Sequence, residues 1–260
     1  MTKAAQAAAK GIVRDFGEIE KLQVSKKGAS NFVTSADLRT EKILIEQLAK
    51  ARPQFAFLSE ESGASGDANA TERFVIDPID GTTNFIHAIA YIAISIAAQK
   101  RDENGNWHTH AGIVYDPIHD ELFAAEKGKG AFFNGNYRLR VSARDEDALI
   151  GTTSPRSYRK DFERTLGTFI KLSQSGFTLR CSGSAALDLA YVAAGRLDAS
   201  WYHKLNLWDL AAGALLVTEA GGKFTSETGE AFDAETGSIL ASNGLLHGTL
   251  AEAVRGAQAA

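Results

Sequence analysis

Cysteine and proline are both scarce in this sequence of 260 residues, which has one cysteine, Cys181, and 4 prolines. A single cysteine cannot form a disulfide within the chain or supply the thiolates of a structural zinc site, so any metal site must use oxygen ligands. The sequence also has no proline-rich linker, internal repeat or low-complexity segment. We therefore expect the parts of the chain to pack together without a flexible joint.

Positive charge is not in excess either. The formal net charge is −4 and the isoelectric point is about 5.9, whereas a surface dedicated to nucleic acid or membrane lipid normally needs a basic excess. No run of roughly eighteen apolar residues occurs, and the amphipathic N-terminus lacks the continuous apolar core of a signal peptide. These absences predict a cytoplasmic protein with no nucleic-acid and no membrane partner, in which bound cations would attract any anionic substrate.

What is present is an ordinary globular composition, with 44% hydrophobic and 23% charged residues. Apolar residues spaced by three and four predict a first helix over residues 3–22. A second helix is predicted to start with Thr34 or Ser35 as its cap and to stop before Pro53, which places Asp37 in its first turn.

Short apolar runs predict strands in the N-terminal half, after a polar connection over residues 25–31. Turn-forming sequences predict hairpins at residues 104–106 and 134–136. The predicted strands cover residues 55–59, 74–76, 91–99, 111–115 and 122–125. Residues 1–145 are therefore expected to form an α+β half, with two helices against an antiparallel sheet.

From about residue 149 strands and helices alternate, which predicts an α/β arrangement for a C-terminal half, residues 146–260. The predicted strands cover residues 149–153, 177–181, 197–202 and 239–242, and the predicted helices cover residues 162–173, 184–194, 209–220 and 246–256. We expect the two halves to be tightly packed as one unit.

The most informative stretch is Asp77-Pro78-Ile79-Asp80-Gly81-Thr82-Thr83-Asn84-Phe85. It follows the predicted strand 74–76, which Pro78 and Gly81 should prevent from continuing. The two acids would then lie at a strand end, and Thr82 would cap a helix whose free amides face the same place. Because acids bind hard divalent cations and helix-start amides bind phosphate oxygens, the stretch predicts a site for a metal and a phosphate ester. The alternative is a solvated turn of no function.

Three further motifs accompany this stretch. They are Val33-Thr34-Ser35-Ala36-Asp37, then Ser59-Glu60-Glu61-Ser62, and then Trp208-Asp209-Leu210-Ala211-Ala212-Gly213 with Glu219-Ala220-Gly221-Gly222 after it. In their order and spacing the four motifs resemble those of the inositol monophosphatase family. Members of this family are Mg-dependent and lithium-sensitive phosphatases. The resemblance covers nearly the whole chain. It implies a layered α-β-α-β-α sandwich of the inositol monophosphatase and fructose-1,6-bisphosphatase type, and a homodimer.

The resemblance also implies two to three Mg²⁺ ions and their ligands. Glu60, Asp77 and the Ile79 carbonyl would hold a first ion, and Asp77, Asp80 and Asp209 would hold a second. A third, looser ion near Glu60 would bind the attacking water and lower its pKa toward neutrality. Most of these ligands fall in the N-terminal half.

For catalysis, the resemblance implies that Thr82 and Asp37 orient and deprotonate the attacking water, together with the ion at Glu60, and that no covalent phosphoenzyme forms. The amides of Gly81 and Thr82 would hold phosphate oxygens. The substrate-binding residues that it implies are Asp80, Gly81, Thr82, Arg180, Gly183, Ser184, Ala185, Tyr202 and Asp209.

Several of these motifs have a simpler explanation. Asp209 could only cap the helix that it begins, and Glu61 is expected to be solvated or to stand behind Glu60. The two histidines at 108 and 110 would share one strand face, but with no third ligand they are expected at the surface. Residues 128–130 lack the strand-to-helix context of a nucleotide loop and predict a turn.

The leading hypothesis is a Mg-dependent phosphomonoesterase for inositol 1-phosphate or a similar small polyol phosphate. Residues 83–85 resemble inositol monophosphatases, whereas Tyr202 stands where the family usually has a glutamate that contacts inositol hydroxyls. A phenol can still bond a hydroxyl, although without charge. Histidinol phosphate, 3′-phosphoadenosine 5′-phosphate and fructose 1,6-bisphosphate are therefore alternative substrates. A non-catalytic metal-binding regulatory protein is disfavoured because every expected acid is present, and a kinase because no phosphate loop for ATP occurs.

Overall fold

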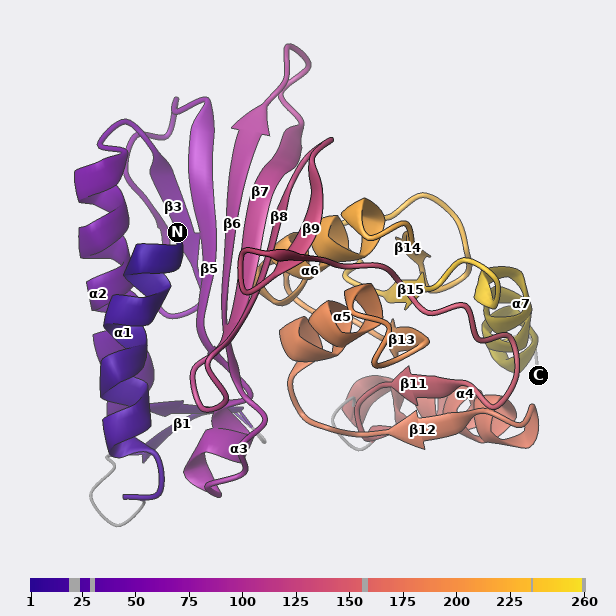
Figure 1. The fold of residues 1–260 in the computed structure, drawn as a ribbon. Helices are drawn as coiled ribbons and strands as arrows, with labels where there is room; N and C mark the ends of the chain where they lie inside the picture. Colours follow the sequence, from indigo (N-terminus) through magenta and orange to yellow (C-terminus); the bar gives the residue numbers. More distant parts are fainter. Residues whose placement is uncertain (19–23, 29–30, 156–158, 235, 259–260) are drawn as a thin grey trace.

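The computed structural model describes residues 1–18, 24–28, 31–155, 159–234 and 236–258. Its elements form five layers in the order α-β-α-β-α, as the family resemblance implies (Figure 1). The helices are α1 (Thr2–Asp15), α2 (Ser35–Ala51), α3 (Thr82–Ile86), α4 (Phe162–Gln174), α5 (Ala185–Ala193), α6 (Leu207–Glu219) and α7 (His247–Gln258), with a 3₁₀ turn at Arg159–Asp161. None of the described helices is long and apolar enough to cross a membrane.

The first two layers are α1 with α2 and the larger sheet. This sheet has the strand order β10-β9-β8-β7-β6-β5-β3-β4 over the described residues, and only β3 and β5 pair in parallel. Its strands are β3 (Ala56–Ser59), β4 (Gly63–Ser65), β5 (Glu72–Asp80), β6 (Ala93–Arg101), β7 (Trp107–Asp116), β8 (Glu121–Glu126), β9 (Gly130–Phe133) and β10 (Tyr137–Arg138). The helices cover one face with small buried side chains such as Ala5 and Ala8, so they can pack closely.

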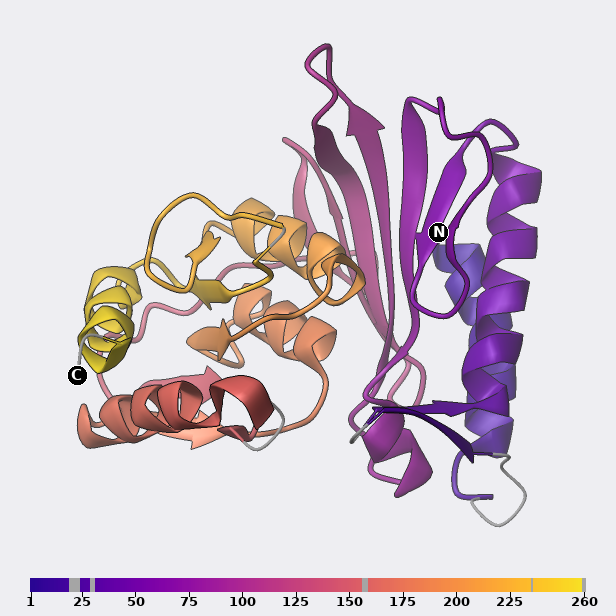
Figure 2. The same cartoon turned by 180° about the vertical axis from the view of Figure 1, so that it is seen from behind.

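The other layers are α5 with α6, the smaller sheet, and α4 with α7, as the reverse view also shows (Figure 2). The smaller sheet has the order β12-β11-β13-β15-β14, parallel on the β12 side and antiparallel on the β14 side. Its strands are β11 (Leu149–Gly151), β12 (Thr178–Arg180), β13 (Ala199–Tyr202), β14 (Lys223–Ser226) and β15 (Ile239–Ser242). The predicted alternation of strand and helix in this half is confirmed.

Helices α5 and α6 fill the space between the two sheets. One apolar cluster joins Val114 and Phe123 of the larger sheet to Leu216 of α6 and Ile239 of the smaller sheet. Helix α6 approaches β7 so closely that a Cβ on Gly112 would lie 2.9 Å from the Cα of Ala212. The two sheets therefore share a core rather than meeting across a linker, and the expected boundary at residue 145 falls in the connection between β10 and β11.

Some predicted boundaries are wrong. Strand β5 does not stop at Ile76 but runs through Pro78 to Asp80. Its pairing with β6 slips by one residue between Asp77 and Asp80, which is a β-bulge. A bulge leaves a residue outside the ladder, so the missing N–H of Pro78 is tolerated there.

Other strands lacked a sequence signal. The connection predicted over residues 25–31 instead contains a two-stranded ladder of β1 (Val24–Gly28) and β2 (Asn31–Thr34). Strands β4, β9, β10 and β14 are also additional to the prediction, whereas both predicted hairpins are confirmed. The turn predicted at residues 128–130 is present at residues 127–129, and Gly130 begins β9. Helix α1 ends at Asp15, and the last residues of its predicted range, 19–22, lie outside the described residues.

Candidate metal and phosphate site

The bulge in β5 and the turn after it position the first acids of the site. Asp77 is 1% exposed, and one of its carboxylate oxygens, Oδ1, accepts a hydrogen bond of 3.0 Å from the Ile79 amide. Gly81 follows with a φ of 99°, and a Cβ there would lie 3.0 Å from the Tyr91 carbonyl oxygen. Only glycine fits both the backbone angle and the space at this position.

The N-cap of α3 is Gly81 and not Thr82, so the predicted capping role of Thr82 is wrong. The Thr82 hydroxyl lies 3.2 Å from Asp37 Oδ1 and 3.2 Å from the Ile79 carbonyl oxygen. Asp37 is fully buried in the first turn of α2, as predicted. The structure thus brings Thr82 and Asp37, 45 residues apart in sequence, into one hydrogen bond.

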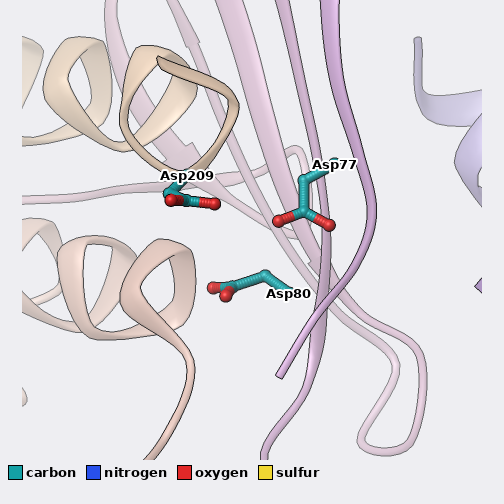
Figure 3. Close-up of side chains that lie close together, drawn as sticks. All are labelled: Asp77, Asp80 and Asp209. Carbon is teal, nitrogen blue, oxygen red and sulfur yellow. The ribbon is translucent and has the colours of Figure 1, made fainter. Parts of the chain in front are cut away.

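Asp209 comes from the opposite side of the site. Helix α6 begins at Leu207, two residues before the prediction, and Asn206 is its N-cap. Asp209 Oδ2 accepts a hydrogen bond of 2.8 Å from the Asn206 amide, so this acid does cap its helix. Its carboxylate nevertheless faces the acids of β5 (Figure 3). Capping and cluster membership are therefore both features of Asp209.

Asp77, Asp80 and Asp209 form the acidic cluster. Each offers one carboxylate oxygen, and these atoms all lie within 4.8 Å of one another. Burial raises the pKa of Asp77 well above its usual value, and the charges of Glu60, Asp80, Asp209 and Asp37 raise it further. Burial and the charge of Asp80 likewise raise the pKa of Asp209. Like charges held this close without water favour protonation or a bound cation.

The third acid, Asp80 of β5, accepts hydrogen bonds from the start of helix α5. Asp80 Oδ2 accepts hydrogen bonds of 2.6 Å from the Ser184 hydroxyl and of 2.6 Å from the Ala186 amide. Burial raises the pKa of Asp80 to about 6, while these bonds and the Ala185 amide act in the opposite direction. Ser184 and Ala185, which sequence analysis assigned to the substrate, therefore contact Asp80 and orient it.

Glu60 lies next to the cluster but outside the group of three. Its amide donates a hydrogen bond of 3.1 Å to the Ile76 carbonyl of β5. Its charge raises the pKa values of both Asp77 and Asp209, so its carboxylate is near them. The structure thus brings together three of the four predicted acids within the span of one ion and places Glu60 at its edge.

Sequence analysis did not single out Glu41, a buried acid of α2. It lies one helical turn after Asp37, on the same face of the helix. Glu41 Oε2 accepts a hydrogen bond of 3.0 Å from the Glu61 amide and a second bond from the Ser59 hydroxyl. Glu41 therefore anchors the segment that carries Glu60. The spacing of four between two acids in one helix was the signal that could have found it.

Tyr202 takes a place that the sequence did not predict. It is 2% exposed, and its hydroxyl donates a hydrogen bond of 2.6 Å to Asp188 Oδ2. Tyr91 donates one of 2.5 Å to Asp188 Oδ1. Burial raises the pKa of Asp188 to about 7 although both phenols act to lower it. Tyr202 thus reaches the site through Asp188 on α5, and neither Tyr91 nor Asp188 was singled out from the sequence.

Of the remaining candidates, Gly183 packs beside the site, and Arg180 and His108 have exposed side chains. Gly183 has a φ of 93°, and a Cβ on it would lie 2.8 Å from Asn84 Nδ2, so it packs directly against α3. Arg180 is exposed at the end of β12, where its guanidinium donates to the neighbouring Leu179 carbonyl. His108 is exposed and lies 2.9 Å from Asp102, in agreement with the predicted surface position.

The donor set fits a hard divalent cation. It consists of oxygen atoms only, and among the described residues no lysine or arginine is bonded to Asp77, Asp80 or Asp209. Carboxylates are the ligands that Mg²⁺, Mn²⁺ and Ca²⁺ prefer. A cation at this place would neutralise the carboxylate repulsion that adds to burial in raising the pKa values of Asp77 and Asp209.

Several known proteins are similar to this chain over most of its length. A sequence model of the inositol monophosphatase family matches residues 1–259. The inositol-1-monophosphatase of Caulobacter vibrioides is 46% identical over 260 residues, or 99% of this chain and 100% of that one. The Nus factor SuhB of Escherichia coli K12 is 42% identical over 222 residues, or 85% and 81%. The crystal structure of extragenic suppressor protein suhB from Bartonella henselae has a TM-score of 0.92 at 44% identity, over 98% of this chain and 96% of that one.

Proposed function

This chain belongs to the inositol monophosphatase family, and we propose that it is a Mg-dependent phosphomonoesterase that hydrolyses inositol 1-phosphate or a similar small polyol phosphate. The observation that supports the proposal most is the acidic cluster. Two acids of β5 and one acid of α6, 129 residues or more apart in sequence, have carboxylate oxygens within 4.8 Å of one another. Such a convergence costs stability in a protein without a cation, so a role in binding one accounts for it.

Five groups are proposed to hold the metal ions. Asp77, Asp80 and Asp209 provide the inner carboxylates, and Glu60 and the Ile79 carbonyl provide further oxygens at the edge of the cluster. When bound, divalent ions neutralise the charge of a phosphate ester and lower the pKa of water. Asp77 would serve more than one ion, because it lies between Glu60 and the other two acids in charge contact with all of them.

Thr82 and Asp37 are proposed to move the proton of the attacking water. The Thr82 hydroxyl would take a proton from the water and pass its own proton to Asp37, 3.2 Å away. Asp37 is buried, so its carboxylate is held in place and protected from bulk water. The water oxygen would then bond to phosphorus as the ester oxygen leaves. No protein nucleophile takes part.

The amides at the start of α3 are proposed to bind phosphate oxygens. The first N–H groups of a helix have no carbonyl of their own helix to bond, and they carry partial positive charge. Gly81 and Thr82 present such amides beside Asp80.

The identity of the alcohol depends on the surroundings of Tyr202. Its hydroxyl already donates to Asp188, so it offers a substrate only an acceptor oxygen and almost no surface. Inositol 1-phosphate is the first candidate because of the family and the named relatives. Histidinol phosphate, 3′-phosphoadenosine 5′-phosphate and fructose 1,6-bisphosphate remain alternatives. A regulatory role without turnover is the second class, which the relatives named Nus factor SuhB keep open.

A substrate panel tests the proposal. Phosphate release from these four esters is measured with Mg²⁺ and with a chelator in its place. We expect Mg-dependent release that is fastest for inositol 1-phosphate and is inhibited by millimolar lithium. An absence of Mg-dependent release from every ester would refute the catalytic proposal and favour the regulatory one, and release unaffected by lithium would count against the family mechanism. The proposed homodimer is tested separately by sedimentation equilibrium.

A further inference from the structure

A second concave region lies between the larger sheet and helix α6. It is a cavity of about 820 Å³, within the range of small-molecule sites. We call it the Trp107 cavity. Its lining is Arg73, Gln99, Gly105, Asn106, Trp107, His108, Thr109, Lys127, Leu207, Leu210, Ala211, Ala214, Leu215, Thr218, Glu219, Phe224, Phe232, Asp233 and Ala234. None of the acids proposed to bind metal is among these residues.

One wall of the cavity is cationic and aromatic. The guanidinium of Arg73 lies 4.2 Å from the centre of the Trp107 ring, and that of Arg101, which does not line this cavity, lies 4.6 Å from the same ring. The Arg73 Nε donates a hydrogen bond of 2.9 Å to Gln99 Oε1, which fixes the orientation of the group. Burial and the nearby Arg101 charge lower the pKa of Arg73 to about 10.

Among the described residues, none of these cations forms an ion pair, although two acids, Glu219 and Asp233, also line the cavity. Neither Arg73, Arg101 nor Lys127 has an acidic partner in the part of the chain that the structure describes, and the buried Nε of Arg101 has no hydrogen-bond acceptor. The glutamate of the lining, Glu219, is already used, because its two oxygens accept bonds of 2.7 and 2.8 Å from the amides of Gly128 and Gly130. Two guanidiniums held near each other in a half-buried place are stabilised by an anion.

The other wall is apolar. Leu207 and Ala214 of α6 are half-buried on this side, and Phe224 and Phe232 add two rings whose centres are 5.1 Å apart. Apolar surface of this kind gains free energy when a flat hydrophobic group covers it. The cavity thus places cations on one side and apolar surface on the other.

We propose that the Trp107 cavity binds a small organic anion with a flat apolar body, of the aromatic carboxylate class. The carboxylate pairs with Arg73, and the ring packs between Trp107 and the apolar residues of α6. This site is separate from the metal and phosphate site, and its occupancy requires neither Mg²⁺ nor turnover.

Isothermal titration with 2-naphthoate in the presence of a chelator tests the proposal, and 2-naphthamide serves as the uncharged control ligand. We expect one naphthoate bound per chain and at least tenfold weaker binding of the amide. Arg73→Gln should weaken naphthoate binding about tenfold, since it removes a charge-assisted hydrogen bond. Ala214→Trp should abolish binding by filling the cavity. Lys42→Gln, an exposed change on α2, is the matched control and should bind like the parent.

The readouts distinguish this site from the metal site and from loss of folding. Asp80→Asn should bind naphthoate unchanged, and Arg73→Gln should keep its thermal unfolding midpoint. An absence of saturable binding overturns the proposal, as does equal binding by the parent, Arg73→Gln and Ala214→Trp. Loss of binding in Asp80→Asn also overturns it, because naphthoate would then occupy the metal site. None of these outcomes depends on whether the phosphatase proposal holds.

Discussion

Two regions of the protein contain buried carboxylates, and the groups around these carboxylates differ in charge. Asp198 is fully buried at the start of β13, where Oδ1 accepts bonds of 2.5 Å from the Ser142 hydroxyl and 2.7 Å from Arg144 Nε, and Oδ2 accepts one of 2.8 Å from the Leu149 amide. Every oxygen thus has a donor. In the acidic cluster, Asp77 instead has other carboxylates as its charged neighbours. The first arrangement stabilises the fold by itself, whereas the second is stabilised by protonation or by a bound cation.

The largest expected effect comes from removal of one charge in the acidic cluster. Asp80→Asn should lower kcat about 10³-fold at saturating Mg²⁺, because an ion that stabilises the transition state loses a ligand. Without metal, the free energy of unfolding of the same variant should equal or exceed that of the parent, because the variant lacks one of the charges that repel each other. Steady-state kinetics and urea unfolding in a chelator measure both. Asp145→Asn, at an exposed acid, is the control, and a metal-free Asp80→Asn that is clearly destabilised would contradict the comparison.

Asp198→Asn should show the reverse pattern. It weakens the bonds of a charged acceptor to three donors, so the free energy of unfolding should fall by about 2 kcal/mol. The estimate is modest because Arg144 is half exposed and can find water. Isothermal titration of the folded variant should give an unchanged Mg²⁺ affinity. A large loss of Mg²⁺ affinity with unchanged stability would erase the distinction between the two regions.

Glu41→Gln tests whether Glu41, which anchors the segment that carries Glu60, affects Mg²⁺ binding. The change keeps the size of the side chain but weakens its bonds to Ser59 and to the Glu61 amide, so Glu60 should be less well placed. We expect the Mg²⁺ concentration for half-maximal rate to rise about tenfold, with a small change in the rate at saturation. Glu46→Gln on the exposed face of α2 should leave both unchanged. Equal Mg²⁺ dependence of the two variants would remove Glu41 from the site.

The smallest expected effect concerns Asp188, which has two hydroxyl donors but, among the residues that the structure describes, no cationic partner such as Asp198 has. Its folded pKa of about 7 lies above the unfolded value of 3.8, so protonation favours the folded state. Its stabilising contribution is fully present below about pH 4 and is lost as the pH rises through about 7. The difference in unfolding free energy between the parent and Asp188→Asn should therefore fall over this interval, in urea titrations at several pH values with saturating Mg²⁺. A difference independent of pH would show that Asp188 is ionised throughout.

Local patterns in the sequence predicted most of the secondary structure and the acids of the site. Helix periodicity placed α2 and hence Asp37, and the Asp-Gly-Thr string placed the acids of β5. The family resemblance supplied what periodicity could not, the meeting of Asp209 with residues of β5. That contact depends on packing between layers, and no spacing along the chain encodes it.

The failures have the same physical origin. Pro78 normally ends a strand, but here a bulge removes the need for its N–H, and bulges follow from pairing with β6. Tyr202 of β13 was assigned to the substrate from its position in the motif, and sequence analysis did not give the hydrogen bond of its hydroxyl to Asp188 of α5. Both outcomes were decided by a neighbour that is distant in sequence.

The position of Asp209 in α6 has a consequence for biosynthesis. A ribosome delivers the acids of β5 when less than a third of the polypeptide exists, but the last acid of the cluster arrives only after residue 209 leaves the exit tunnel. A nascent chain would therefore lack one of the proposed metal ligands until α6 has docked. Products truncated before residue 209 are consequently expected to bind a divalent cation less tightly than the full chain.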